Sequence, residues 1–256
     1  TANTNQFDFY PAINSSYRIH NNITLFASWN KATRMPTFTD LYYTTQTHIG
    51  NSNLESEKSE SLEAGLKFSN HSINGNLTAF YMKGRKLLGW VKPREEELWE
   101  SRNHSRLKKR GVEPNINLNL KELLGKSLPL NSLSVGYIYL SQNLVEDELI
   151  SNYTLNHLRH KFTASLQHDI LHNLSMSWNF RWQDRRGSYL KYVDLQPTEV
   201  TPYEPFSLLD VKVNYRLHNI NLYTNINNVF NVEYLDLGNL PQPGIWMMVG
   251  VNYTIY

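Results

Sequence analysis

Residues 228–256 read NVFNVEYLDLGNLPQPGIWMMVGVNYTIY, and from position 245 onward apolar and mixed side chains alternate strictly. One set of alternate positions holds Ile245, Met247, Val249, Val251, Tyr253 and Ile255, and the other holds Trp246, Met248, Gly250, Asn252, Thr254 and Tyr256. Successive side chains of a strand point to opposite faces, so the pattern predicts a strand that is apolar on one face only. An apolar strand at an open edge promotes aggregation, and closing the sheet into a barrel removes that edge. The segment therefore favours a β-barrel.

The same period of two recurs along the chain and predicts eleven strands. They are expected at residues 7–19, 23–29, 58–68, 73–90, 111–120, 133–140, 161–167, 174–183, 209–215, from 220 onward, and 245–256. The eighth is the clearest, with Leu174, Met176, Trp178, Phe180 and Trp182 on one face and Ser175, Ser177, Asn179, Arg181 and Gln183 on the other. The tenth loses its phase near Asn227 and Asn228, which we interpret as a β-bulge.

The connections between these strands alternate in length. Short turns are expected at residues 20–22, 70–71, 171–173 and 217–219, and long connections at 32–57, 91–104, 144–157 and 187–205. Outer-membrane barrels have short periplasmic turns and long extracellular loops. A soluble β-sandwich would show the same strand alternation, with the apolar face inside. Because a sandwich has no reason to sort its loops by length, the connections favour the barrel.

Composition excludes several classes of protein. The chain of 256 residues has no cysteine, which rules out disulfides and cysteine metal sites, and its net charge of +2 does not indicate a nucleic-acid partner. No apolar run approaches the roughly 18 residues that a membrane helix needs. The sequence has no nucleophile-elbow serine, no His-Glu metal motif and no phosphate-binding glycine loop. We therefore expect no enzyme activity, metal or cofactor.

Two segments resemble TonB-dependent outer-membrane receptors. Residues 228–234 are similar to the N-L-F-N-x-x-Y segment of the penultimate strand in that family, and residues 250–255 to its closing G-V-x-Y-x-F. Residues 34–43 and 50–59 resemble its R-x-P-[ST]-[FL]-x-[DE]-L-Y … G-N-P-x-L-x-P-E-K-S segment, with Ser52 and Ser56 in place of prolines. Ile245 and Ile255 also depart from the pattern, which has an arginine and an aromatic residue there.

The resemblance implies an all-β fold, a transmembrane antiparallel β-barrel in the outer membrane of a Gram-negative bacterium. Eleven strands are half of the 22 found in plugged outer-membrane transporters. We therefore expect residues 1–256 to be the C-terminal part of such a barrel, with the plug and the first strands outside this sequence. Expected partners are TonB through that plug, the remaining N-terminal half, outer-membrane lipid and lipopolysaccharide, a surface lipoprotein and a small-molecule ligand.

The implied function is uptake of a scarce large solute with TonB-derived energy. The form P-T-F-T-D-L-Y-Y at residues 36–43 is most similar to vitamin B12 (corrinoid) receptors of Bacteroidota. A haem or ferric-siderophore receptor is the alternative, because His48 lies where haem receptors of this family carry an iron ligand. A soluble or surface β-sandwich that binds glycan on aromatic side chains is the alternative of another class.

Candidate substrate-binding residues all lie in or beside the long connections. They are Arg34, Tyr42, Tyr43, His48, Trp90, Tyr189 and Tyr192. Large ligands bind concave sites lined by aromatic and apolar groups with a few polar ones, which is why the aromatic residues are included. The competing interpretation is that residues 34–59 are loop architecture common to receptors for many ligands. The charged run at residues 92–110 is expected to be a solvated surface loop facing lipopolysaccharide or a lipoprotein lid.

The alternation in residues 174–183 yields a first prediction. In the assembled receptor, a spin label at Met176 should report contact with lipid and one at Asn179 contact with water, because the two positions point to opposite faces. Accessibility to oxygen and to a water-soluble paramagnetic reagent distinguishes the two environments. The reverse assignment would favour the soluble sandwich.

Residues 1–256 expressed alone should aggregate, since two strand edges would lie unpaired in hydrocarbon.

Overall fold

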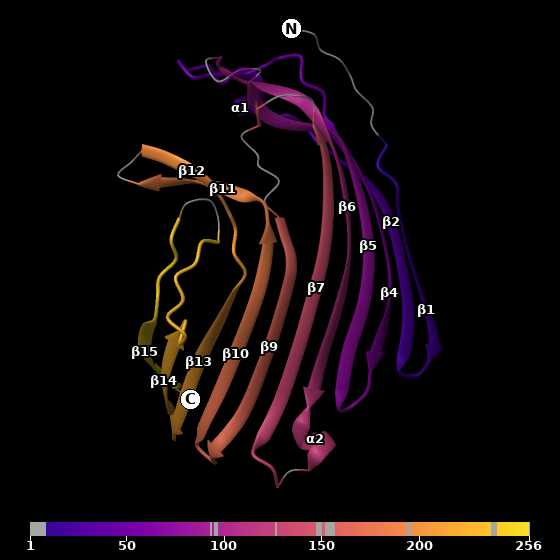
Figure 1. Cartoon of the computed structure of the whole chain (residues 1–256). Helices are drawn as coiled ribbons and strands as arrows, with labels where there is room; N and C mark the ends of the chain where they lie inside the picture. The colour runs from indigo at the N-terminus through magenta and orange to yellow at the C-terminus, as the bar shows by residue number, and fades with distance from the viewer. Residues whose placement is uncertain are drawn as a thin grey trace.

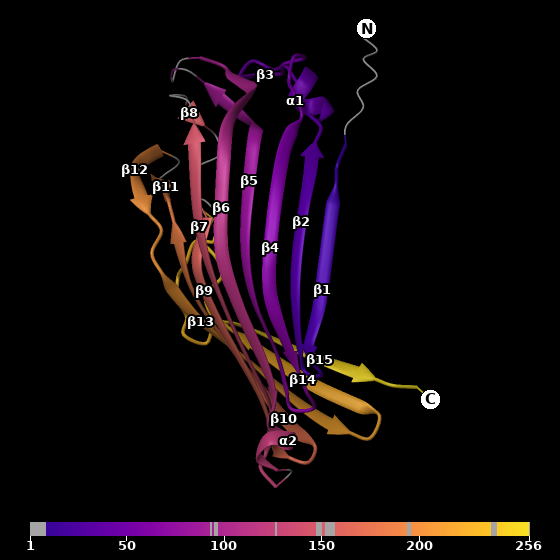
Figure 2. The same ribbon diagram turned by 90° about the vertical axis from the view of Figure 1, so that its right-hand side faces the viewer.

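One curved antiparallel sheet makes up most of the computed structural model, which describes residues 9–92, 94, 97–125, 127–146, 150–151, 157–193, 196–236 and 240–255 (Figure 1). Along the sheet the strands are β1 (Ala12–His20), β2 (Ile23–Arg34), β4 (Glu57–Ser69), β5 (Ile73–Lys92), β6 (Trp99–Asn119), β7 (Leu130–Glu146), β9 (His157–Leu171), β10 (Leu174–Arg186), β13 (Phe206–Leu217), β14 (Ile220–Asn227) and β15 (Trp246–Tyr253). This path of eleven strands matches the number predicted from the sequence. Figure 2 shows the sheet bent like part of a barrel wall.

Smaller elements gather at the two ends of the sheet. At the upper end in Figure 1 lie α1 (Phe38–Tyr42), β3 (His48–Ile49), β8 (Ile150–Ser151) and the hairpin of β11 (Ser188–Val193) with β12 (Gln196–Pro202). At the lower end lies α2 (Leu120–Leu124) beside short turns. The long connections predicted at 32–57, 144–157 and 187–205 are thus confirmed at the upper end, whereas the one predicted at 91–104 shortens to residues 93–98, and the lower connection that carries α2 is longer, at residues 120–129. Within the described residues, no helix is long and apolar enough to cross a membrane.

The prediction that residues 92–110 form a solvated loop is wrong for most of that range. β5 continues to Lys92 and β6 starts at Trp99, so the charged run belongs to a strand of 21 residues. Its backbone is paired with β5 on one side, and on the other side with β3 at Trp99 and Glu100 and with β7 from Ser105 onward. Polar side chains on both faces hide the apolar alternation there, whereas backbone pairing keeps the chain extended. β7 and β9 likewise extend beyond the predicted bounds.

An apolar face runs across the sheet because directly paired residues lie on the same side. One row joins Leu25, Leu66 and Leu77 on β2, β4 and β5. A second row joins Val135, Ala164, Phe180 and Leu209 from β7 to β13. At the far edge, Ile226 pairs with Met247 on the same face.

The apolar face is exposed rather than packed against a second layer. Leu77 is 45% exposed, whereas Thr78, which points to the opposite face, is 9% exposed. Among the described residues, the only other sheet is the β11–β12 hairpin at one end. A soluble sandwich would bury its apolar face, so this arrangement excludes the sandwich. An apolar outer face and a polar inner face are the pattern of a membrane barrel.

On the polar face, aromatic rings lie across paired glycines. Tyr223 is opposite Gly250, and Phe26 is opposite Gly65. A Cβ on Gly250 would be 2.2 Å from a ring carbon of Tyr223, and one on Gly65 would be 2.7 Å from a ring carbon of Phe26. The ring therefore occupies the space that a side chain would need. This gives a physical reason for the glycine in the closing G-V-x-Y segment.

Asn228 organises the connection from β14 to β15. The residue is 3% exposed and has a left-handed φ of 51°, which asparagine tolerates well. Its backbone N–H donates to Asp210 (2.8 Å), its side-chain amide donates to the carbonyl of Val232 (2.8 Å), and its Oδ1 accepts from the Val232 N–H (2.9 Å). Asn231 Oδ1 accepts from the backbone N–H of Ile245 at 2.9 Å. The two asparagines of the N-V-F-N segment thus fix both ends of the connection.

The loss of phase near residue 228 agrees with the predicted bulge: the register of β13 with β14 would place Asn228 opposite Leu209, but the Val229 N–H is the group that donates to the Leu209 carbonyl, at 2.8 Å. Before that point, the pairing of β14 with β13 and β15 continues to the end of β14 without a register shift. The loss of alternation marks the end of the strand, where Asn228 turns the chain.

Asp236 ties the same connection to β10. Its Oδ1 accepts from Gln183 Nε2 and from the Arg185 guanidinium, both at 3.0 Å. Burial by itself would raise the pKa of the Asp236 carboxyl. The hydrogen bonds from Gln183 and Arg185 and the nearby guanidinium charges outweigh burial and hold this pKa below its ordinary value.

A pH dependence follows from the lowered pKa. The ionised contact stabilises the connection above the unfolded pKa of aspartate and is lost as the pH falls through the lower folded value. In the full-length receptor, hydrogen exchange of residues 229–236 is measured and corrected for intrinsic rates. The exchange rate should rise about two- to fivefold once the pH is below the folded pKa of Asp236, as expected of a half-exposed ion pair. Asp236→Asn should show the faster exchange already at neutral pH. Glu233→Gln removes an exposed carboxylate nearby and should exchange like the wild type; equal protection in Asp236→Asn would contradict the role of the charge.

Candidate ligand-binding site

Arg34 ends β2 and joins three elements of the upper end. Its Nε and one terminal nitrogen donate to the two carboxylate oxygens of Glu57 at 2.9 Å each, and another terminal nitrogen lies 3.7 Å from Asp40. Glu57 also accepts from the backbone N–H of Leu88 at 2.8 Å. This two-pronged pairing is the arrangement that arginine makes best with a carboxylate. Arg34 therefore holds β2, β4 and α1 together, as the architectural interpretation of this segment expects.

Thr37 and Asp40 start α1 with reciprocal hydrogen bonds. The Thr37 hydroxyl accepts from the Asp40 N–H (3.1 Å), and the Asp40 carboxylate accepts from the Thr37 N–H (2.9 Å). This capping box satisfies amides that the first turn leaves without partners. The helix separates the two neighbouring tyrosines, because Tyr42 packs on Phe38 with ring centroids 4.9 Å apart while Tyr43 leaves the helix.

Three of the predicted site residues meet in one aromatic cluster. The ring of His48 is 5.2 Å from Trp90 and 6.3 Å from Tyr43, and Tyr43 is 6.3 Å from Trp90. Trp99 completes the cluster, stacked on His48 at 6.5 Å, with the Lys92 ammonium 5.0 Å from its ring. We call Tyr43, His48, Trp90 and Trp99 the loop cluster.

Backbone pairing brings the loop cluster together. β3 runs parallel to β6 and sets His48 directly beside Trp99. Trp90 lies near the end of β5, which pairs with β6. Sequence reasoning missed Trp99 because it lies within the charged run at residues 92–110, which was interpreted as a solvated loop. Among the described residues, no three histidine or acidic side chains gather as a metal site.

A second cleft lies between the β11–β12 hairpin and the β14–β15 connection, with a volume of about 520 Å³. Tyr189 is in it, 5.1 Å from the ring of Tyr203. Phe206 and Tyr234 pack at 4.4 Å, and the Arg181 guanidinium lies about 6 Å from both rings. Tyr192 belongs to β11, but its side chain is outside the described residues.

The predicted site residues thus divide into separate groups. Tyr43, His48 and Trp90 meet, Tyr189 lies in the second cleft, and Arg34 and Tyr42 make local contacts. Sequence reasoning missed Tyr203, Phe206 and Tyr234; the last belongs to the N-V-F-N-V-E-Y segment, where the resemblance suggested only strand structure. Both groups combine aromatic rings with a cation, which suits a large ligand with flat or anionic parts.

Comparisons with known proteins agree with this architecture. The FrpB iron transporter from Neisseria meningitidis is 20% identical, with a TM-score of 0.71 over 95% of this chain and 39% of that one. The ferric enterobactin receptor PfeA from Pseudomonas aeruginosa is 16% identical, with a TM-score of 0.72 over 96% of this chain and 40% of that one. The copper transporter OprC is 13% identical, with a TM-score of 0.73 over 94% and 38%. The chain thus spans about two fifths of the length of these structures.

A search of curated protein sequences gave no match. The family model described as TonB dependent receptor-like, beta-barrel matches residues 1–229, which is most of the chain. The chain therefore belongs to the TonB-dependent receptor-like β-barrel family, whose members are outer-membrane proteins of Gram-negative bacteria.

Proposed function

We propose that the chain forms part of the barrel wall of a receptor that binds a scarce large solute at the cell surface and passes it inward with TonB-derived energy. Family membership supports the general activity. Within the described residues, β1 pairs only with β2 and β15 only with β14, so both edges need further strands in a membrane. In this proposal the remaining strands and the plug, through which TonB would act, belong to the rest of the receptor.

The observation that carries the binding role is the pair of aromatic groups at the end with long connections. In the loop cluster, Tyr43 is 47% exposed and therefore accessible to a solute. The second cleft adds Tyr189, Tyr203 and Tyr234 beside Arg181 and Arg185. Each group has rings at the ends of strands, Trp90 and Trp99 in the loop cluster and Tyr189 and Phe206 in the second cleft. These rings are held in place before a ligand arrives, which lowers the entropic cost of binding.

The first candidate ligand is a corrinoid, supported by the similarity of residues 36–43 to vitamin B12 receptors. The contacts of Arg34, Thr37 and Asp40 explain much of that segment as local architecture, which weakens its bearing on the ligand. A ferric siderophore is the second candidate. Arg181, Arg185 and Lys92 lie against the aromatic rings and would complement an anionic iron complex. Solved relatives include a siderophore receptor and a ferric enterobactin receptor.

The experiment uses the full-length receptor and measures binding of vitamin B12, haem and ferric siderophores by titration calorimetry, with growth on each as a second readout. Tyr43→Ala combined with Trp90→Ala should weaken binding of the true ligand about tenfold, since buried aromatic anchors carry much of an interface's energy. Tyr42→Ala is the matched control, because Tyr42 packs on Phe38 outside the cluster, and binding should change less than twofold.

The variants also separate the ligand classes. His48→Ala should leave corrinoid binding nearly intact, because a cobalamin carries its own axial base. Loss of haem-dependent growth alone in His48→Ala would point to haem instead. Arg181→Gln with Arg185→Gln should impair an anionic siderophore more than a corrinoid. Removal of TonB should abolish uptake and leave binding unchanged; uptake that persists without TonB would overturn the proposed function.

A further inference from the structure

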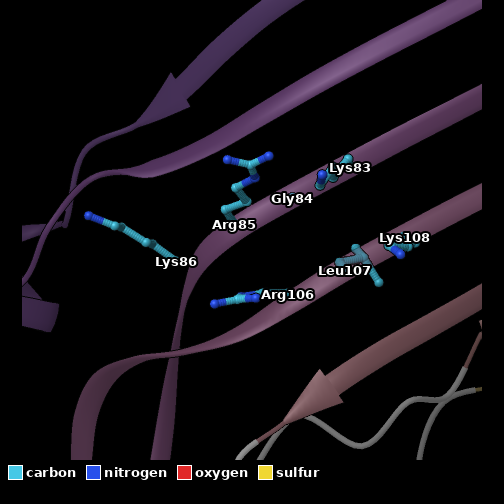
Figure 3. A pocket seen from close by; sticks show the side chains of 7 residues that line it. All are labelled: Lys83, Gly84, Arg85, Lys86, Arg106, Leu107 and Lys108. Carbon is cyan, nitrogen blue, oxygen red and sulfur yellow. The ribbon is translucent and has the colours of Figure 1, made fainter.

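A group of cations lies on the apolar face of the sheet, near its upper end. Lys83 and Arg85 of β5 lie directly opposite Lys108 and Arg106 of β6 (Figure 3). Lys58 of β4 is directly opposite Arg85. We call these five residues the outer basic patch. Their face follows from the register, because Lys83 and Arg85 continue the alternate positions that hold Leu77 and Tyr81 lower on β5.

The patch places like charges directly against each other. Two adjacent rows, Lys83 with Lys108 and Arg85 with Arg106, join cations across neighbouring strands, an arrangement that destabilises a sheet. Among the described residues, no carboxylate lies within ion-pair distance of any residue of the patch. The nearest acid in the register, Glu60, is opposite Lys83 and accepts a hydrogen bond from Trp29 Nε1 at 2.9 Å. By contrast Lys86, next to Arg85 in sequence, forms an ion pair with Glu55.

The patch begins where the apolar band ends. On β5 the outward positions pass from Leu77 through Tyr81 to Lys83 and Arg85. Arg85 is four residues beyond Tyr81, about 13 Å along the strand at roughly 3.3 Å per residue. Tyrosine and tryptophan mark the water interface on barrels, and Tyr81 and Trp29 occupy that level here. The cations therefore lie at the depth of the lipid headgroups on the side of the long connections.

We propose that the outer basic patch binds the phosphate groups of a lipid in the outer leaflet, with lipopolysaccharide as the probe of that chemistry. Phosphates would neutralise the two repulsive rows, and an arginine guanidinium matches two phosphate oxygens at once. Because the patch faces away from the lumen, this binding is separate from the solute site, and it rests only on the membership of the chain in an outer-membrane barrel family.

The test refolds the full-length receptor in detergent and titrates it with purified lipopolysaccharide, measured by native mass spectrometry. Replacing Lys83, Arg85, Arg106 and Lys108 together with glutamine should weaken binding about 100-fold, since each basic residue near anionic lipid changes affinity about fivefold and neighbouring effects are partly shared. The matched control replaces four cations of the polar face, Lys67, Lys109, Lys161 and Lys212, and binding should change less than threefold.

Two probes identify the source of the phosphate. Dephosphorylated lipopolysaccharide should bind the wild type about as weakly as intact lipopolysaccharide binds the fourfold variant, and millimolar inorganic phosphate should compete poorly. Should the fourfold variant not refold, Arg85→Gln and Lys108→Gln singly should each weaken binding about fivefold. Any one of four results would overturn the proposal. These are unchanged lipopolysaccharide binding in these variants, an equal loss of binding in the control variant, equal binding of the dephosphorylated lipopolysaccharide, and full competition by inorganic phosphate. Solute binding in the fourfold variant should stay normal, so failure here leaves the proposed function intact.

Discussion

Backbone pairing between neighbouring strands is the constraint on which the structure depends. Inside a membrane no water is available to an unpaired N–H or C=O group, so a spanning strand must be paired along both sides. The same pairing continues above the apolar band, where residues 99–110 stay in β6 although half of their side chains are charged. It also fixes the register, and the register carries the apolar face from strand to strand. The apolar positions of single strands form one continuous outer surface only because the register places them side by side on neighbouring strands.

At and beyond the last paired residues of the strands, side chains form the hydrogen bonds that connect neighbouring strands. At the upper end Arg34 and Glu57 connect β2 to β4, and Glu57 also reaches the backbone of Leu88 on β5. Asn103 of β6 accepts from the Glu55 N–H and donates to the Glu55 and Lys86 carbonyls, each at 2.8 Å. These contacts rigidify the strand ends on which the loop cluster stands. The motif residues Arg34 and Glu57 thus position other residues at this end of the sheet.

The two faces of the sheet support different chemistry at the same end of the molecule. The connections above it carry aromatic groups with nearby cations, such as Tyr203 beside Arg185 at 5.6 Å, that suit a large solute. The outer face carries cations directly above its apolar band, at the level of lipid headgroups. The proposed binding of solute and the proposed binding of lipid phosphate would therefore vary independently, since no residue of the outer basic patch belongs to either aromatic group.

The sequence by itself determined the fold class, the eleven strands of the main sheet and the alternation of long and short connections. The alternation of apolar and polar residues indicates which face of a strand each residue occupies, and it can be recognised within a few neighbouring residues of the sequence. It did not determine where β6 begins, because charged residues on both faces remove the apolar signal while the backbone stays paired with β5. Nor did it reveal that Tyr43, His48, Trp90 and Trp99 meet. The parallel pairing of β3 with β6 joins residues about fifty positions apart, and only the tertiary structure fixes such contacts.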